Sequence, residues 1–119
     1  MAAGAPWPEK LEFRAGARAL DIRFDDGETL SIPFELLRVE SPSAEVQGHG
    51  AHQKKLVAGK ANVQVTGAEP VGRYAVRLTF DDGHDSGIYS WRYLRELGET
   101  AGERLDDYAR RLKAAGLSR

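Results

Sequence analysis

The sequence contains no cysteine among its 119 residues. Disulfide bonds, thiolate metal sites and cysteine nucleophiles are therefore all excluded. The chain also lacks an apolar run near the roughly 20 residues that a membrane-spanning helix needs, and no apolar signal-peptide core follows its start. Neither sign of charge is in excess, because 17 basic residues face 18 acidic ones. We therefore expect neither nucleic acid nor a membrane surface as a partner.

The remaining composition is that of an ordinary globular chain, with 41% hydrophobic and 29% charged residues. A chain of this length forms one domain with a single core. We expect residues 1–8 to be a flexible N-terminal arm, 9–98 to be the folded body and 99–119 to be an amphipathic helix packed on or beside it. In the absence of a targeting segment, the expected location is the cytoplasm.

What the chain does have is an internal repeat. The segments Phe24–Arg38 and Phe80–Leu97 share one order of features: an alternating strand, an Asp-Asp-Gly turn, a return strand and a helix. Phe24 and Phe80 occupy equivalent positions 56 residues apart. Asp-Gly between two alternating runs is a strong hairpin signal, because glycine reaches positive φ without a steric penalty. The repeat therefore predicts two related β-β-α units.

These units predict an α+β fold, with a further strand before each of them and one helix after the second. We expect a two-layer sandwich, in which an antiparallel-rich sheet is covered by helices on one face. The two units should pack as related halves of one sheet, with Phe24 and Phe80 both in the core. Arg38 and Arg95 are equivalent helix positions at an offset of 57 residues.

Helix boundaries in the second half are marked by familiar signals. Ser90 is a plausible N-cap and Gly98 a plausible terminator of the helix after the second hairpin, with Trp91 on its core face. Thr100, followed three residues later by a glutamate, resembles a capping box. The helix that follows carries an apolar stripe at helical spacing. Its members are Leu105, Tyr108, Ala109 and Leu112.

The segment Glu40–Lys60 shows no helical pattern and is rich in glycine and proline. A loop of this length inside a compact domain is usually functional or disordered. It carries His49 and His52, which are three residues apart and close enough in sequence to share a metal, although simple solvent exposure explains them better. His84 follows the second Asp-Asp-Gly turn and is explained by a solvated turn. The lysines of Glu40–Lys60, with Arg73, suggest a basic rim.

Other polar groups have simpler explanations. The repeated acid pairs Asp25-Asp26 and Asp81-Asp82 serve the same turn twice, so turn chemistry explains them better than catalysis does. Ser41, Ser43 and Ser90 have no histidine at a spacing that would indicate a catalytic triad. We expect no catalytic residue set and no cofactor.

Three stretches resemble a known family: LRVESPSAEVQGHG at Leu37–Gly50, EPVGRYAV at Glu69–Val76 and FDDGHDSGIYSWRYL at Phe80–Leu94. Over roughly Leu11 to Leu97, the chain resembles the gamma-butyrobetaine hydroxylase-like N-terminal domain family. Members occur as small stand-alone bacterial proteins, as the N-terminal domain of carnitine-pathway hydroxylases, and attached to P-loop iron–sulfur carrier ATPases. The domain is not the catalytic part of any of them.

The resemblance also implies where a zinc site would lie, since the hydroxylases carry three cysteines and a histidine in this domain. Those positions fall on Ser41, Ser43, Val46 and His84 in this chain. Serine is a poor zinc ligand and valine is none, so the site is degenerate and we expect no metal. The oxygenase domain has no counterpart in this chain.

We interpret the chain as a non-enzymatic binding or adaptor domain with an unknown protein partner, for which an iron–sulfur carrier or a related assembly factor is the candidate class. Two alternatives remain: a metal-binding protein that uses His84 with His49 or His52, and a small enzyme acting on an unknown metabolite. If His84 and Arg92 belong to a partner surface, His84→Ala and Arg92→Glu should leave stability within about 0.5 kcal/mol. The expected partner-binding residues are His49, His52, Lys54, Lys55, His84, Arg92 and Tyr93.

Overall fold

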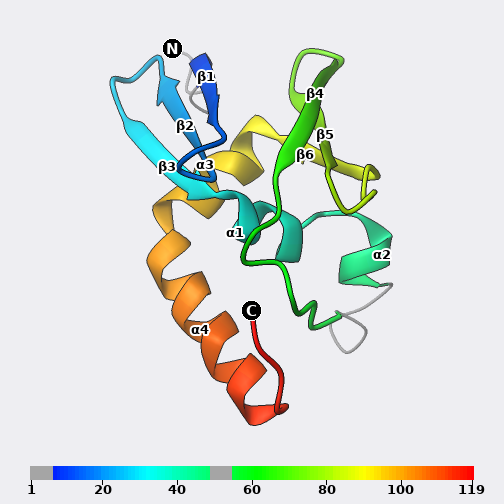
Figure 1. The fold of residues 1–119 in the computed structure, drawn as a ribbon. Coiled ribbons are helices and arrows are strands. Elements are labelled where there is room, and N and C mark those ends of the chain that lie inside the picture. Colours follow the sequence, from blue (N-terminus) through cyan, green and yellow to red (C-terminus); the bar gives the residue numbers. More distant parts are fainter. Residues whose placement is uncertain (1–6, 49–54) are drawn as a thin grey trace.

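The computed structural model describes residues 7–48 and 55–119. Two β-β-β-α units follow one another along the chain, with one short helix between them and one longer helix after them (Figure 1). The elements are β1 (Pro8–Arg14), β2 (Ala19–Phe24), β3 (Thr29–Pro33), α1 (Phe34–Val39), α2 (Ala44–Gln47), β4 (Val65–Val71), β5 (Ala75–Phe80), β6 (Gly87–Ser90), α3 (Trp91–Glu99) and α4 (Ala101–Ala114).

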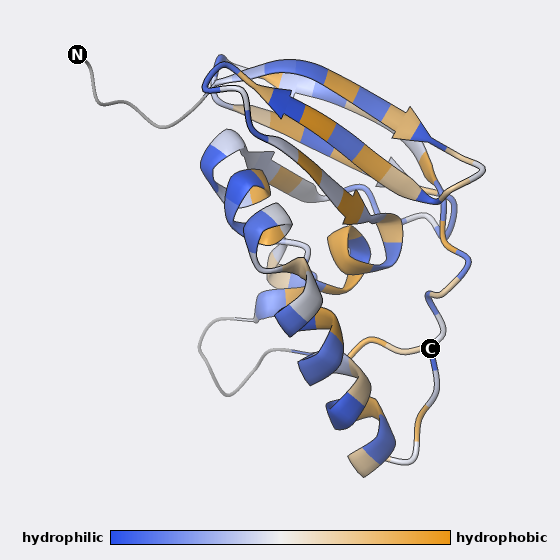
Figure 2. Cartoon of the chain, turned by 90° about the vertical axis from the view of Figure 1, so that its left-hand side faces the viewer, coloured by the Kyte–Doolittle hydropathy of each residue, from blue (hydrophilic) through white to orange (hydrophobic). Residues whose placement is uncertain are grey.

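The strands form one layer and the helices the other, which confirms the predicted α+β sandwich. Figure 2 shows the strands on one side of the molecule and the helices on the other. The sheet layer differs in one respect from the prediction of a single sheet, because the strands form two three-stranded antiparallel sheets of order β1-β2-β3 and β4-β5-β6. Each strand pairs with its neighbour in the sequence, so the hydrogen bonding closes within each unit.

The two predicted turns have the same geometry. Gly27 and Gly83 have φ angles of 87° and 90°, which only glycine adopts easily. The amide of Gly27 donates to the carbonyl of Phe24 at 3.0 Å. In the second unit, the amide of Gly83 donates to the carbonyl of Phe80, also at 3.0 Å. The repeat seen in the sequence is therefore a repeat of backbone structure.

The core lies between the two layers and draws on both units. Phe24 and Phe80 are 0% and 1% exposed, so the prediction that both are core residues is confirmed. They belong to one cluster of buried apolar side chains. Its other members include Leu20, Ile22, Ile32, Phe34, Leu36, Leu37, Val76, Leu78, Tyr89, Leu94, Leu97, Tyr108 and Leu112.

Ser90 caps α3 as predicted, since its Oγ accepts a hydrogen bond from the amide of Tyr93 at 3.0 Å. The prediction that Gly98 ends this helix is wrong, because α3 continues to Glu99. Gly98 lies against β3, where an added Cβ would be only 2.8 Å from the side chain of Leu30. Its lack of a side chain therefore permits close packing of α3 on β3.

The predicted capping box at Thr100 does not form. The Thr100 hydroxyl donates to the carbonyl of Glu96 and accepts from Arg104, both at 2.7 Å, and makes no cap hydrogen bond. Tyr108 and Leu112 of α4 are buried as the apolar stripe predicts, but Ala109 is exposed. The buried stripe of α4 is therefore narrower than the sequence pattern suggested.

Trp91 is half-buried rather than a core residue. Its indole Nε1 donates to the carbonyl of Arg73 at 2.8 Å, and its ring meets that of Trp7 edge-on, with centroids 6.4 Å apart. Trp7 also contacts Tyr74, and β1 begins at Pro8, so these two residues of the expected N-terminal arm belong to the fold. The residues before Trp7 lie outside the described part.

One helix was not predicted. α2 lies within the long segment after α1, and the Ser43 hydroxyl caps it by accepting from the amide of Glu45 at 3.2 Å. A single turn is too short for a periodic pattern, so only its cap was readable. None of the helices in residues 7–48 and 55–119 is both long and apolar enough to cross a membrane.

Candidate functional site

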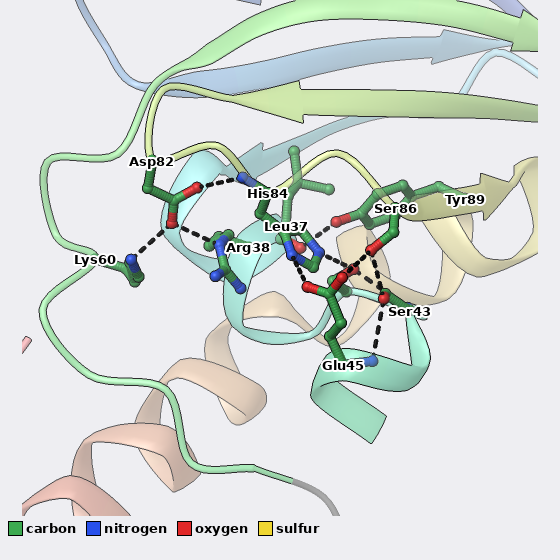
Figure 3. Close-up of polar contacts among 10 residues, drawn as sticks. Leu37, Arg38, Ser43, Glu45, Lys60, Asp82, His84, Ser86 and Tyr89 are labelled. Carbon is green, nitrogen blue, oxygen red and sulfur yellow. Dashed lines mark hydrogen bonds and ion pairs between the residues drawn. The ribbon is translucent and has the colours of Figure 1, made fainter. Parts of the chain in front are cut away.

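His84 connects the second unit to α2 and to the segment before that helix (Figure 3). The turn after β5 carries it, and only 2% of its side chain is exposed. Its Nε2 lies 2.9 Å from Oγ of Ser41, and its Nδ1 lies 3.2 Å from Oε2 of Glu45. Because a carboxylate only accepts hydrogen bonds, Nδ1 carries a proton in this arrangement. The expectation of a solvated or partner-exposed His84 is therefore corrected.

Ser43 extends this cluster towards the surface. Its Oγ lies 2.7 Å from Oγ of Ser86, and the Ser86 hydroxyl donates to Oε1 of Glu45 at 3.2 Å. Glu45 is thus held by two hydrogen bonds from the turn after β5. We call Ser41, Ser43, Glu45, His84 and Ser86 the histidine cluster. It ties α2 and the segment before it to the second unit.

Gly87 leaves room for the side chains of Ser41 and Tyr89, because it has no side chain of its own. A Cβ added to it would lie 2.5 Å from Oγ of Ser41 and 3.0 Å from Cε1 of Tyr89. Tyr89 is buried beneath, where its hydroxyl donates to the carbonyl of Leu37 at the end of α1. Burial raises the pKa of the Tyr89 phenol far above its usual range, so it stays neutral and donates.

Ser41, His84 and Glu45 have the order of hydrogen bonds found in a serine–histidine–carboxylate triad. Their burial is the reverse of what that chemistry needs. Ser41 is 0% exposed and already accepts from the amide of Ser43 at 3.3 Å, whereas the Glu45 side chain is 67% exposed. A substrate would therefore reach the carboxylate and not the hydroxyl. The geometry fits a structural cross-link and gives no support to hydrolysis.

The four positions implied for zinc are Ser41, Ser43, Val46 and His84, and the structure brings the first two close to His84. They do not fit a metal. Val46 is buried and apolar, and the serine oxygens are engaged in neutral hydrogen bonds. Nowhere in the described part of the chain do three or more histidine, aspartate or glutamate side chains form a group that could hold one. The alternative that uses His49 or His52 concerns residues outside the described part.

Beside the histidine cluster, Asp82 binds two cations. Its Oδ2 lies 2.7 Å from Nε of Arg38 and 2.6 Å from Nζ of Lys60. Its Oδ1 accepts from the amide of His84 at 3.0 Å. Partial burial acts to raise the pKa of this carboxyl, but the hydrogen bonds from Lys60, His84 and Arg38 outweigh it and hold the pKa well below its usual range.

A groove of about 620 Å³ opens next to these groups. Its basic and acidic members are Arg38, Lys55, Lys60 and Glu45, with His84 at the same site. Its apolar members come from α2 and from the segment that leads towards β4. They are Val46, Leu56, Val57 and Ala58. We call this surface the basic groove.

The residues predicted to bind a partner do not form one surface in the described part of the structure. Lys55 is exposed and lines the basic groove, and Arg92 is exposed on α3. Tyr93 is half-buried, and its hydroxyl donates to the carbonyl of Glu40, where the long segment begins. Burial, followed by the charge of Glu40, raises the pKa of Tyr93 to about 12. The other three, His49, His52 and Lys54, lie outside the described residues.

Sequence reasoning missed Glu45, Ser86 and Arg38 at this site. The contacts that reveal them join residues 39 to 44 positions apart, which no local pattern encodes. One signal was available for Arg38, because it is the repeat equivalent of Arg95. A conspicuous arginine at the same helix position in both units indicates a shared role for its charge.

Comparisons with known proteins identify a family and several similar structures. The family model for gamma-butyrobetaine hydroxylase-like proteins, N-terminal, matches residues 11–95. Two solution NMR structures, both 44% identical, match with TM-scores of 0.85 and 0.84 and cover 100% and 98% of this chain and 89% and 91% of theirs. A crystal structure of a protein with unknown function from Acidithiobacillus ferrooxidans, assigned to the DUF971 family, is 40% identical. It has a TM-score of 0.65 and covers 76% of this chain and 91% of its own. No curated protein matches the chain.

Proposed function

This chain belongs to the gamma-butyrobetaine hydroxylase-like N-terminal family, and from that premise we propose that it is a non-enzymatic binding domain whose partner occupies the basic groove. The partner is a protein, and an iron–sulfur carrier or a related assembly factor is the class that the family resemblance favours. The proposed compartment is the cytoplasm.

The observation that carries this proposal is the combination of apolar and basic side chains in one open groove. Leu56, Val57 and Ala58 are only partly buried although they pack against the core cluster, so they leave apolar surface at the groove. Lys55 and Lys60 place positive charge beside that surface. Apolar area bordered by charge is typical of protein-binding surfaces.

The histidine cluster supports the proposal indirectly. Ser41, His84 and Glu45 use their polar atoms on one another and so fix α2 against the second hairpin. This contact gives the groove a rigid wall, because both the α2 side and the turn side are held. A preformed surface binds a partner with a smaller loss of conformational entropy.

The test compares partner capture by the wild-type chain and by two matched surface variants in lysate from the native host. Leu56→Asp changes the groove, whereas Ile88→Asp changes an exposed apolar residue, 48% exposed, on β6. Proteins identified by mass spectrometry should be lost with Leu56→Asp and retained with Ile88→Asp. A captured protein must then bind the purified wild-type chain directly. Equal capture by both variants would place the interface elsewhere.

A further inference from the structure

The two equivalent arginines have different surroundings. Arg95 is engaged by two carboxylates: its guanidinium lies 3.1 Å from Oδ2 of Asp26, and its Nε lies 2.8 Å from Oε2 of Glu99. Glu99 is four residues further along α3, on the same helix face. The hydrogen bonds that Arg95 donates to both carboxylates raise its pKa, with Asp26 the larger cause.

Among the described residues, Arg38 has one carboxylate partner, the turn aspartate Asp82 that is equivalent to Asp26. Its Nε is bound to Asp82, but Lys60 shares the same carboxylate oxygen. The residue four positions after Arg38 is Pro42, which offers no carboxylate. Among the described residues, Nη1 of Arg38 is buried and has no hydrogen-bond partner. In Figure 3, Nε of Arg38 faces Asp82, and the terminal Nη nitrogens point away from it.

An unpaired donor of a charged group is costly, so a missing partner at this position calls for an explanation. Arg38 lines the basic groove, with 12% of its side chain exposed. Lys60 lies beside it and Lys55 is exposed in the same groove. In Arg95 the Nη nitrogens bind Asp26 and Nε binds Glu99. In Arg38, Nε already binds Asp82, so a carboxylate entering the groove would bind the Nη side of the guanidinium.

We propose that the basic groove binds an acidic, partly apolar segment of a partner protein, with an aspartate or glutamate side chain on Arg38 and Lys60. The neighbouring Val46, Leu56 and Val57 would contact apolar residues that flank the acid. This inference rests on the proposed binding role of the groove and specifies the chemistry of its occupant.

A carboxylate fits better than a phosphate. The repeat itself supplies the template, because both partners of Arg95 are carboxylates. Glu45, with 67% of its side chain exposed, also lines the groove and repels a dianion more strongly than a monoanion. Arg38 and Lys60 carry two positive charges, and Asp82 supplies one negative charge between them. One carboxylate side chain of the partner would balance the remaining positive charge.

The experiment is an NMR titration of the ¹⁵N-labelled full chain with the acetylated, amidated peptide Leu-Asp-Glu-Leu. The matched peptide Leu-Asn-Gln-Leu keeps the size and removes the charge. Inorganic phosphate is titrated separately. The acidic peptide should shift the amide resonances of Val57 and Lys60 and bind at least tenfold more tightly than the amide peptide, as expected for hydrogen bonds between charged groups.

Arg38→Gln should abolish this preference, whereas the equivalent change Arg95→Gln should leave it intact. If Arg38→Gln impairs folding, Lys55→Gln replaces it and should weaken binding of the acidic peptide about threefold, with a weaker dependence on salt. Circular dichroism checks the fold of each variant.

Four results would overturn the inference: equal binding of both peptides, no binding of either, a preference that Arg38→Gln and Lys55→Gln leave unchanged, or a response to phosphate alone. If capture in the lysate depends on Leu56 while the acidic peptide shows no preference, the groove still binds a partner. In that case only the inferred chemistry fails.

Discussion

Arg38 of the first unit and Asp82 of the second form an ion pair, with Nε 2.7 Å from Oδ2. The equivalent pair runs in the opposite direction, because Arg95 of the second unit lies 3.1 Å from the carboxylate of Asp26 in the first. Each helix thus supplies an arginine to the other unit's Asp-Asp-Gly turn. The two units are joined by a reciprocal exchange of charged contacts.

The Arg38–Asp82 pair should make stability depend on pH. Because the pKa of Asp82 is lowered in the folded state, its contribution is fully present above the unfolded value of about 3.9 and is lost as pH falls below it. Asp82→Asn should cost about 1–2 kcal/mol at pH 7 and should lose less stability than the wild type between pH 5 and pH 3. Urea unfolding measures both; Asp85→Asn, an exposed change in the same turn, is the control.

His84→Ala should destabilise the protein by about 2–3 kcal/mol, because it removes two hydrogen bonds and leaves the buried Ser41 hydroxyl without its partner. This replaces the expectation, drawn from the sequence, of an almost neutral change. Arg92→Glu is exposed and should stay within about 0.5 kcal/mol. Equal, small effects in thermal unfolding would contradict the buried cluster.

Gly87→Ala should destabilise the chain, since the added methyl would lie 2.5 Å from Oγ of Ser41. Ser41→Ala in the same chain removes that oxygen and should recover part of the loss. Full recovery is not expected, because Tyr89 remains 3.0 Å from the new methyl. A double-mutant cycle of unfolding free energies measures this coupling, and additive effects would show that the two residues do not meet.

Phe24→Ala and Phe80→Ala should each cost about 3–5 kcal/mol, as expected for fully buried phenylalanines. The two sites are equivalent in the repeat, yet Phe24 also has the guanidinium of Arg95 4.9 Å from its ring centre. The loss at Phe24 should therefore be the larger by about 0.5–1 kcal/mol. Denaturant unfolding of both variants decides this, and losses below 1 kcal/mol would be inconsistent with burial.

The purified protein should carry no stoichiometric zinc or iron. Replacing Ser41, Ser43 and Val46 together by cysteine should create a site with His84, because Ser41 contacts His84, Ser43 contacts Ser41, and Val46 lines the same groove as His84. We expect about one zinc per chain by elemental analysis, lost when His84→Ala is added. Absence of metal from the triple variant, if folded, would show that the positions are not equivalent to the family's ligands.

The sequence predicts the local features of this fold well. Alternation before Phe24 and Phe80 and the glycines of the two turns depend on neighbours a few residues apart, so they can be read directly. Ser90 as a cap is local in the same sense. The α+β class followed from those signals, and the family resemblance added the positions of Ser41 and His84.

What escaped prediction depends on contacts between distant residues. Gly98 has the sequence signal of a helix terminator, but in the fold it packs against Leu30 inside α3. Thr100 has the signal of a cap, but its hydroxyl binds the carbonyl of Glu96 and the side chain of Arg104 instead. The burial of His84 likewise depends on Ser41, 43 positions away. The division into two sheets belongs to the same class, because alternation does not specify which strands pair.

The reciprocal arginine contacts also bear on how the chain reaches its folded state. In each unit the helix arginine binds a turn aspartate of the other unit, and only Arg95 also has a carboxylate partner, Glu99, in its own unit, among the residues that the structure describes. Two separate copies of such a unit would meet through an isologous interface, as in a homodimer. Covalent tethering turns that encounter into an intramolecular one with a high effective concentration. The tether therefore raises the local concentration of each turn aspartate around the arginine of the other unit.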